Sequence, residues 1–437
     1  MPCIPIIQQK GRLLKAPMSW ILYYLIGLFF RLGIRPLFEL RVNGLENYSK
    51  TPSSLVVANH KRDLDSVLIA TILYFDEGFL NPSKPVSFMG DENLFQPGFL
   101  GNWIKGPKIL KKALQPISLN YILQKLNAYP IGKLDFHSVP VHEALRIIKE
   151  NDDDHKLKDI IKEDALESLF GDSSFGDTGM TISEFFDSEG YPRKKIDSRN
   201  FKSDFRKAVK KTKLGAVKEQ LNRFVQVLNE GAILYITPEG TLSKNGMLGP
   251  LKDSLLILID EADPDIVVVP TNITYDFMKP GKTRIFVHLG EEITGLEELN
   301  RKERSQKLRR AILRLTTINL SQLASYRLLE AEEAGRTRVE PDELLDRINE
   351  DLDKFSRNGF NLDDQLSDPE GVEERWISFI EYCEDRNVLE RRDDGRLYLA
   401  SDLGYDRSEI PRGYRRDPVK YCANEIRSLE KVSLIDL

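Results

Sequence analysis

The chain alternates between short apolar runs and longer amphipathic segments. The apolar runs predict strands, at 54–58, 129–136, the first part of 232–243, 265–276 and 283–290. The amphipathic segments predict helices, at 65–75, 217–231, 305–335, 341–355, 373–389 and 417–431. The segment 305–335 is either one long helix or two. Strands that alternate with helices predict an α/β fold, in which a mostly parallel sheet is flanked by helices.

Two regions depart from this alternation. Residues near 151–215 are polar and highly charged, which predicts a partly helical insertion within a domain that spans 41–330. From 340 onward the pattern is mainly helical, apart from a predicted hairpin at 389–400 with Asp-Gly at its turn. We therefore expect 340–437 to form a small, acidic, mainly helical C-terminal domain.

The N-terminal segment holds an uninterrupted apolar run of 11 residues, 20–30, with Lys15 before it and Arg31 and Arg35 after it. A membrane-spanning helix needs about 20 apolar residues, so this run is too short to span. No small-residue cleavage site follows it, which argues against a secretory leader. Aromatic residues flanked by cations are typical of a helix in the membrane interface. We expect such a helix within 1–40, and a helix buried in the core is the alternative.

The formal net charge of -5 says little, but the charges are unevenly distributed. Basic residues outnumber acidic ones in 1–134, and acidic residues outnumber basic ones in 340–437. A basic half suggests an anionic partner, which is a membrane surface, a phosphate ligand or a nucleic acid; a solvated charged face is the alternative. The three cysteines follow no disulfide spacing, which favours reduced thiols and a cytoplasmic chain. The sequence contains no Cys/His cluster of the kind that binds a metal.

A histidine lies where the first predicted strand ends. His60 follows the run 54–58, and Asp65 lies five positions later, in the first turn of the next predicted helix. Histidine titrates near neutrality and makes a general base when a carboxylate orients one ring nitrogen. Asp63 is also within reach, and a His/Asp pair at this spacing is by itself a weak signal.

A second candidate element follows the strand predicted within 232–243. Gly240, in the string Pro-Glu-Gly-Thr, allows a tight turn with exposed backbone N–H groups. Such a turn, with Thr241, Lys244 and Lys252 nearby, suits a phosphate or a developing oxyanion. The alternative is an ordinary turn from a strand into a loop, capped by the threonine.

Together, the strings NHKRDLD and PEGTLSKNGMLGPLK resemble motifs of the glycerolipid acyltransferase superfamily, in the same order. Enzymes of this superfamily acylate glycerol-3-phosphate or its 1-acyl form. Asn59, His60 and Asp65 match the Asn-His-x4-Asp motif, and this match assigns the orienting role to Asp65. The Phe-Pro-Glu-Gly-Thr-Arg-Ser motif is matched after the later strand, with Leu242 in place of the arginine. The resemblance covers roughly 45–289, apart from the insertion.

Two further motifs match in part. In the second, PIGK places Lys133 where the family usually has arginine, which keeps the charge but loses the bidentate fork. Lys112 lies in register with a Lys-Lys-Glu-Leu stretch upstream, and Val269 and Pro270 match the fourth motif. The acceptor stays open: Pro-Glu-Gly-Thr is more similar to the 1-acylglycerol-3-phosphate branch, whereas NITYDFM and the last predicted helix are more similar to the glycerol-3-phosphate branch.

The resemblance implies acyl transfer in phospholipid synthesis, without an acyl-enzyme intermediate. His60 would take the proton of the acceptor hydroxyl while that oxygen attacks an acyl thioester, and Asp65 would hold the imidazole. Substrate-binding roles are implied for Asn59, Lys112, Lys133, Glu239, Gly240, Thr241, Lys244 and Lys252. The donor would be acyl-CoA or acyl-carrier protein, with no cofactor and no metal. The partners would be a glycerol-phosphate or lysophospholipid acceptor and an anionic membrane surface, at the cytoplasmic face of a membrane.

Other functions compete with this one. A relative of the same fold that binds lipid but is catalytically weak or inactive is suggested by Leu242 and Lys133, whereas the complete His60–Asp65 pair argues against it. A nucleic-acid-binding protein would suit the basic N-terminal half, but the chain has no recognition-helix motif and no RNA-stacking signature. No nucleic acid is therefore expected as a partner. A serine hydrolase is disfavoured because no Gly-x-Ser-x-Gly string is present.

Overall fold

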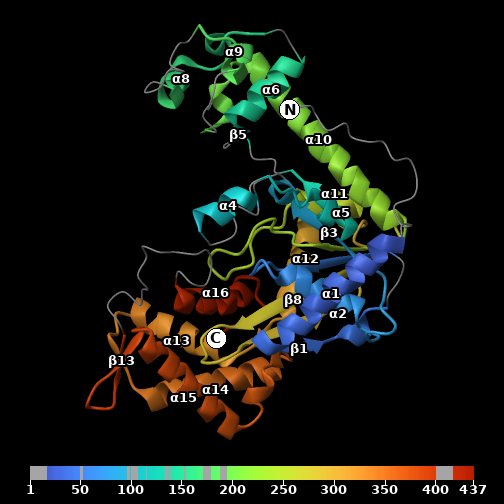
Figure 1. Cartoon of the computed structure of the whole chain (residues 1–437). Helices are drawn as coiled ribbons and strands as arrows, with labels where there is room; N and C mark the ends of the chain where they lie inside the picture. Colours follow the sequence, from blue (N-terminus) through green and yellow to red (C-terminus); the bar gives the residue numbers. More distant parts are fainter. Residues whose placement is uncertain are drawn as a thin grey trace. The chain divides into compact units, whose positions relative to one another are not determined.

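The computed structural model of the chain resolves two compact units, which are drawn together in Figure 1. The first unit comprises 1–89, 119–129 and 224–437, and the second comprises 90–118 and 130–223. The residues that the structure describes are 17–49, 53–95, 99, 107–114, 116–132, 136, 139–151, 154–170, 179–187, 194–399 and 417–437.

A mixed, mostly parallel sheet organises the chain, as predicted. Within the described residues it has seven strands in the order β1-β9-β8-β2-β7-β3-β4. Their bounds are β1 Phe38–Asn43, β2 Ser54–Ala58, β3 Val86–Asp91, β4 Ala128–Ile131, β7 Ile233–Ile236, β8 Val267–Asp276 and β9 Thr283–Leu289. The pairs β2–β7, β2–β8, β3–β7 and β1–β9 are parallel, whereas β8 and β9 are antiparallel.

The central strand β2 explains why the loops of interest meet. All five of its residues are buried, as expected for a parallel strand that is covered on both faces. Val56 is in register with Tyr235 of β7 and with Val269 of β8. Because parallel strands end at the same edge of a sheet, the loops that follow β2 and β7 leave from that edge together.

Helices of the first unit pack on this sheet, α2 against β7, and α12 and α13 against β8. Their bounds are α1 Pro17–Leu37, α2 Asp65–Tyr74, α5 Asn120–Lys125, α11 Asp253–Glu261, α12 Arg301–Arg314, α13 Leu320–Glu333, α14 Pro341–Arg357, α15 Pro369–Asp385 and α16 Pro418–Lys431. The predicted segment 305–335 is thus two helices. The second begins at a capping box, in which the Asn319 side chain accepts from the backbone N–H of Gln322, whose own side chain accepts from the backbone N–H of Asn319.

The segment 340–437 is mainly helical in its described part, as predicted, and it belongs to the first unit. Its last helix, α16, packs along α13 (Figure 1). Short strands complete it, namely β10 Thr317–Ile318 with β12 Asn361–Leu362, and β11 Arg338–Val339 with β14 Leu397–Leu399 and β13 Leu389–Arg391. Cys383 and Cys422 are buried free thiols, whereas Cys3 lies outside the described residues. The domain boundary at 340 stays a prediction.

The second unit contains the polar insertion and has an apolar core of its own. Its elements are α4 Lys108–Leu114, β5 Val139–Pro140, α6 Val141–Asn151, α7 Leu157–Ile160, α8 Glu163–Phe170, α9 Ile182–Asp187, β6 Lys195–Ile196 and the first part of α10 Ser203–Asn229. Leu145, Ile160, Phe170 and Phe185 are among the buried residues of this core. Helix α10 begins 14 residues before the predicted helix at 217, so the basic stretch at the end of the insertion is helical.

The N-terminal helix α1 has one packed face and one exposed face. Tyr23 is buried, its ring meets Tyr74 of α2, and its hydroxyl bonds with the backbone of Val86. The opposite face, here named the α1 outer face, exposes Trp20, Ile21, Leu25, Phe29 and Leu32. Among the described residues, no helix is long and apolar enough to cross a membrane.

Candidate active site

The loop between β2 and α2 carries the His60–Asp65 pair. The Nδ1 atom of His60 lies 3.1 Å from Oδ2 of Asp65, which begins α2. The same oxygen accepts from the backbone N–H groups of Lys61 at 2.6 Å and Arg62 at 2.8 Å. Asp65 is fully buried, whereas the His60 side chain is 18 % exposed. We assign the Nδ1 proton to the bond with Asp65, which leaves Nε2 to accept a proton.

Of the two candidate carboxylates, Asp65 is the one that contacts the His60 ring. Asp63 is exposed, and Asp65 is the carboxylate against the imidazole. Asp65 is reached because the chain turns back at the start of α2, with the backbone N–H of Asp65 donating to the carbonyl of Arg62. The side chain then caps the loop that carries the histidine.

A tyrosine that the sequence analysis did not select completes the contacts of Asp65. Tyr275 lies on β8, and its hydroxyl donates to Oδ1 of Asp65 at 2.5 Å. Burial raises the pKa of Tyr275 well above its usual value, so the hydroxyl keeps its proton. The strand carries several other polar residues, so nothing in the sequence singles out Tyr275.

Asn59 fastens the end of β2 to β8. Its side-chain nitrogen donates to the carbonyl of Ile273 at 3.0 Å, and its side-chain oxygen accepts from the N–H of the same residue at 2.7 Å. Both ends of the amide are therefore engaged with backbone, and the contact with substrate that the resemblance implies stays a prediction.

Glu239 ties the loop after β7 to His60. Its two oxygens accept from the backbone N–H of His60 at 3.0 Å and from that of Gly249 at 2.7 Å. Burial raises the pKa of Glu239, and these two N–H donors oppose that rise. The N–H of Ser243 donates to the His60 carbonyl at 2.7 Å, so both sides of the His60 peptide are held.

The turn at Gly240 faces solvent. Gly240 has φ 65°, in the left-handed region that favours glycine, and its N–H donates to the carbonyl of Thr237 at 3.0 Å. A Cβ placed there would lie 3.6 Å from Cγ of Lys252, so the lysine stem runs beside the turn. Thr241, Lys244 and Lys252 are exposed, and neither lysine has an ion-pair partner among the residues that the structure describes.

The structure does not test the roles predicted for Lys112 and Lys133. Lys112 is exposed on α4, which belongs to the second unit. Lys133 lies outside the described residues. Their predicted roles stay predictions.

The C-terminal helix α16 contacts both the loop after β2 and the loop after β7. Nζ of Lys61 lies 2.6 Å from Oε1 of Glu425, and these side chains are 6 % and 3 % exposed. The other oxygen of Glu425 accepts from the side-chain amide of Gln322. The sequence analysis missed this pair, although a lysine beside the candidate histidine and a glutamate on an apolar helix face are the two signals for it.

Three further contacts of α16 hold the loop 243–249. The Asn424 side chain donates to the Asn245 carbonyl at 2.9 Å, and the N–H of Leu248 donates to Ser428 Oγ at 3.3 Å. Gly246 lies so close to α16 that an added Cβ would be 2.0 Å from the carbonyl oxygen of Tyr421.

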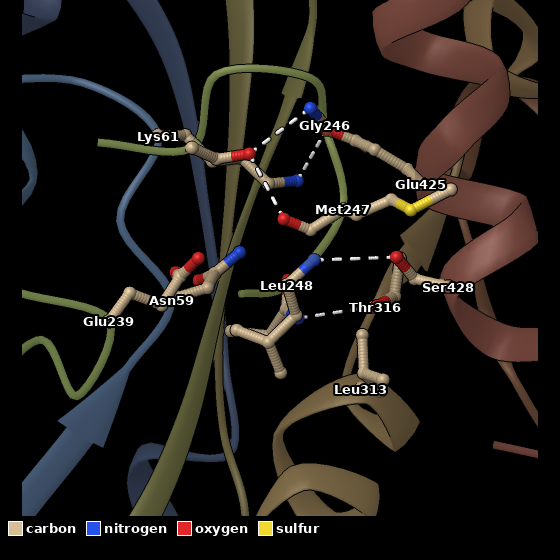
Figure 2. A pocket seen from close by; sticks show the side chains of 12 residues that line it. Asn59, Lys61, Glu239, Gly246, Met247, Leu248, Leu313, Thr316, Glu425 and Ser428 are labelled. Atoms are coloured by element: carbon tan, nitrogen blue, oxygen red, sulfur yellow. Dashed lines mark hydrogen bonds and ion pairs between the residues drawn. The ribbon is translucent and has the colours of Figure 1, made fainter. Parts of the chain in front are cut away.

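Between these loops and α16 lies a cavity of about 20 Å³, shown with its lining side chains in Figure 2. Lys61, Glu239 and Glu425 are among the residues that line it. A space of this size holds about one water molecule and no acyl chain, so the cavity belongs to the support of the site. In the described part of the chain, no group of three or more His, Cys, Asp or Glu side chains is arranged to hold a metal ion.

The arrangement presents one oriented proton acceptor beside a solvent-facing turn. Nε2 of His60 is free of Asp65, and the buried carboxylate stabilises the imidazolium that forms when Nε2 takes a proton. The exposed Lys252 beside Gly240 places a positive charge near the turn. Such a site can deprotonate a hydroxyl group of a substrate.

No protein-family model and no curated protein matches the sequence. Among solved structures, the chain is similar to the crystal structure of the 1-acyl-sn-glycerophosphate (LPA) acyltransferase PlsC from Thermotoga maritima. The TM-score is 0.34 at 16% sequence identity, and the match covers 67% of this chain and 78% of that chain. A similarity at this level carries no argument about function.

Proposed function

We propose that the protein is an O-acyltransferase that moves a fatty acyl group from an acyl thioester to a hydroxyl of a glycerol-phosphate acceptor. The observation that carries the proposal is the His60–Asp65 pair, 3.1 Å apart, at the edge of the sheet where the loop with Gly240 also leaves. The motif order in the sequence supports the same reaction.

In the proposed reaction, His60 acts as the general base. The acceptor O–H bond breaks, its proton passes to Nε2, and the oxygen forms a new C–O bond with the thioester carbonyl carbon. The tetrahedral intermediate then collapses, the C–S bond breaks, and the leaving thiolate takes the proton back from the imidazolium. Positioned general-base catalysis contributes roughly 10²–10⁴-fold, and orientation of the two substrates supplies much of the rest.

The turn at Gly240 would bind the acceptor. Lys244 and Lys252 are exposed and carry the charge that a phosphate requires, and Lys252 runs beside the turn. Leu242 stands where the family has arginine, so the phosphate would be held by ammonium groups as point charges without a bidentate fork. Glu239 would act through the backbone, because its oxygens already hold the N–H groups of His60 and Gly249.

An anionic membrane surface is the proposed partner, with the enzyme at its cytoplasmic face and acyl-CoA or acyl-carrier protein as donor. The α1 outer face offers apolar and aromatic side chains, which suit the interface of a bilayer. Helix α5, which contacts α1, exposes Tyr121 and Ile122, and Nζ of Lys125 lies 5.5 Å from the centre of the Tyr121 ring. A lysine beside exposed aromatic residues adds attraction to anionic lipids.

The proposal is tested by acyl transfer from labelled palmitoyl-CoA in detergent micelles, with glycerol-3-phosphate and 1-acylglycerol-3-phosphate offered separately. A labelled ester from either acceptor supports the proposal and identifies the acceptor. If neither acceptor is acylated with palmitoyl-CoA or with palmitoyl-acyl-carrier protein, while lysophospholipid still binds, the protein is the inactive lipid-binding relative and the proposal is wrong.

A further inference from the structure

We infer that Tyr275 is a positioning residue for the reaction, because it fixes the rotation of the Asp65 carboxylate and through it the imidazole of His60. The inference rests on the proposed function for its catalytic consequence. Its geometric part, the dependence of His60 on the Tyr275 hydroxyl, stands on contacts alone.

The two oxygens of Asp65 have unequal surroundings. Oδ2 has three donors, which are Nδ1 of His60 and the backbone N–H groups of Lys61 and Arg62. In the part of the chain that the structure describes, Oδ1 has one, the Tyr275 hydroxyl at 2.5 Å. The plane of a carboxylate turns by rotation about the Cβ–Cγ bond, and a donor on each oxygen resists that rotation more strongly than donors on one oxygen alone.

Tyr275 itself is held rigidly. Its side chain is fully buried, and its ring stacks on Phe277 with centroids 5.2 Å apart and planes 6° from parallel. The guanidinium carbon of Arg62 lies 5.5 Å from the centre of the Tyr275 ring. A cation near the ring polarises the phenol, which makes its hydroxyl a stronger donor.

The backbone of β8 near Tyr275 is also held by hydrogen bonds. Asn59 binds both backbone polar groups of Ile273, two residues earlier on β8. Residues two apart on a strand point to the same face, so Ile273 and Tyr275 face the same way. The residue before His60 thus helps to hold β8 beside β2, and β8 carries the Tyr275 hydroxyl that donates to Asp65.

This arrangement matters most when His60 becomes charged. The imidazolium formed during proton transfer is stabilised by a carboxylate that lies in its plane. Without the Tyr275 hydroxyl, Oδ1 is a buried acceptor with no donor, and the carboxylate pivots to find one. Among the described residues, the Tyr275 hydroxyl bonds to Asp65 and the neighbour of Gly240 is Lys252, so loss of the hydroxyl should lower kcat and leave KM for the acceptor unchanged.

The test compares Tyr275→Phe with a matched control, Tyr326→Phe. Tyr326 is also buried, and its hydroxyl donates to the carboxylate of Glu430 at 2.8 Å, between helices α13 and α16. Both variants therefore lose one tyrosine–carboxylate hydrogen bond. For each variant and the wild type, we would measure kcat and KM with the acceptor that the wild type acylates. We would also record the NMR resonance of the His60 Nδ1 proton and check folding by circular dichroism.

We expect Tyr275→Phe to lower kcat about tenfold with KM unchanged and to shift the His60 Nδ1 resonance, because a charge-assisted hydrogen bond is lost. Tyr326→Phe should change neither.

The inference is overturned if Tyr275→Phe leaves kcat and the resonance as in the wild type, or if both variants lower kcat equally. A shifted resonance in a chain that transfers no acyl group would support the positioning and refute the proposed function. If Tyr275→Phe does not fold, the wild type and Tyr326→Phe are each labelled uniformly with 3-fluorotyrosine, which keeps the Tyr275 hydroxyl but makes it a stronger donor. A His60 resonance that labelling moves in neither protein overturns the inference.

Discussion

The ion pair between Lys61 and Glu425 gives the sharpest prediction about what holds the site together. Replacing Glu425 by leucine would leave the Lys61 ammonium in a place where its side chain is 6 % exposed. Removing one partner of a buried ion pair costs about 3–5 kcal/mol, because the remaining charge is uncompensated. Whole domains are stable by about 5–15 kcal/mol, so this single change should remove a large part of the free energy of unfolding.

Removing both charges should cost less than removing one. In Lys61→Met/Glu425→Leu neither charge of the pair is left, and the main remaining loss is the side-chain amide of Gln322, which no longer has Glu425 as acceptor. An unsatisfied buried donor costs about 1–3 kcal/mol. The double variant should therefore be more stable than Glu425→Leu by roughly 2 kcal/mol.

The assay is urea unfolding of the wild type, both single variants and the double variant at one pH, followed by circular dichroism. Asp353→Leu is the control, because it breaks an ion pair with Arg357 in which both side chains are about three-quarters exposed. This change should alter the free energy of unfolding by at most about 1 kcal/mol. The reasoning is refuted if Glu425→Leu costs no more than Asp353→Leu, or if the double variant is no more stable than Glu425→Leu.

Three further predictions concern the loop and the membrane. Glu239→Gln should lower acyl transfer at least tenfold, because a carboxamide offers one acceptor oxygen to two backbone N–H groups; wild-type activity would contradict this role. Gly246→Ala should lower activity and stability far more than Gly295→Ala, because both glycines have positive φ but only Gly246 is packed against α16. Equal effects in thermal melts and activity assays would show that the positive φ alone sets the cost of the substitution. Leu25→Glu on the α1 outer face should weaken sedimentation with anionic liposomes, whereas Ile377→Glu on α15 should not, and unchanged sedimentation for Leu25→Glu would remove the role of that face.

The parts of the fold that follow from local pattern could be predicted from the sequence. A parallel strand covered on both faces is a continuous apolar run, and β2 was found with its observed bounds, 54–58. His60 and Asp65 were paired because strand, loop and helix follow one another within a few residues. The polarity of 151–215 indicated an insertion, but short amphipathic helices carry few apolar residues each, so its separate core was not expected.

Contacts between distant parts of the chain could not be predicted in the same way. Tyr275 is 210 residues from Asp65, and Glu425 lies in the last helix, far from Lys61. Each lies among other polar residues of its own element, so the sequence does not single it out, and its partner is set by the packing of distant elements. For the same reason the backbone bonds of the Asn59 and Glu239 side chains were not foreseen, and their predicted contacts with substrate stay predictions.

The role of His60 as general base is tested most directly by the rate of acyl transfer in His60→Ala, measured beside the wild type with the acceptor that the wild type acylates. We expect the rate to fall by roughly 10²–10⁴-fold, with the circular dichroism spectrum and liposome binding unchanged. A correctly folded His60→Ala protein that transfers acyl groups at the wild-type rate would contradict the mechanism.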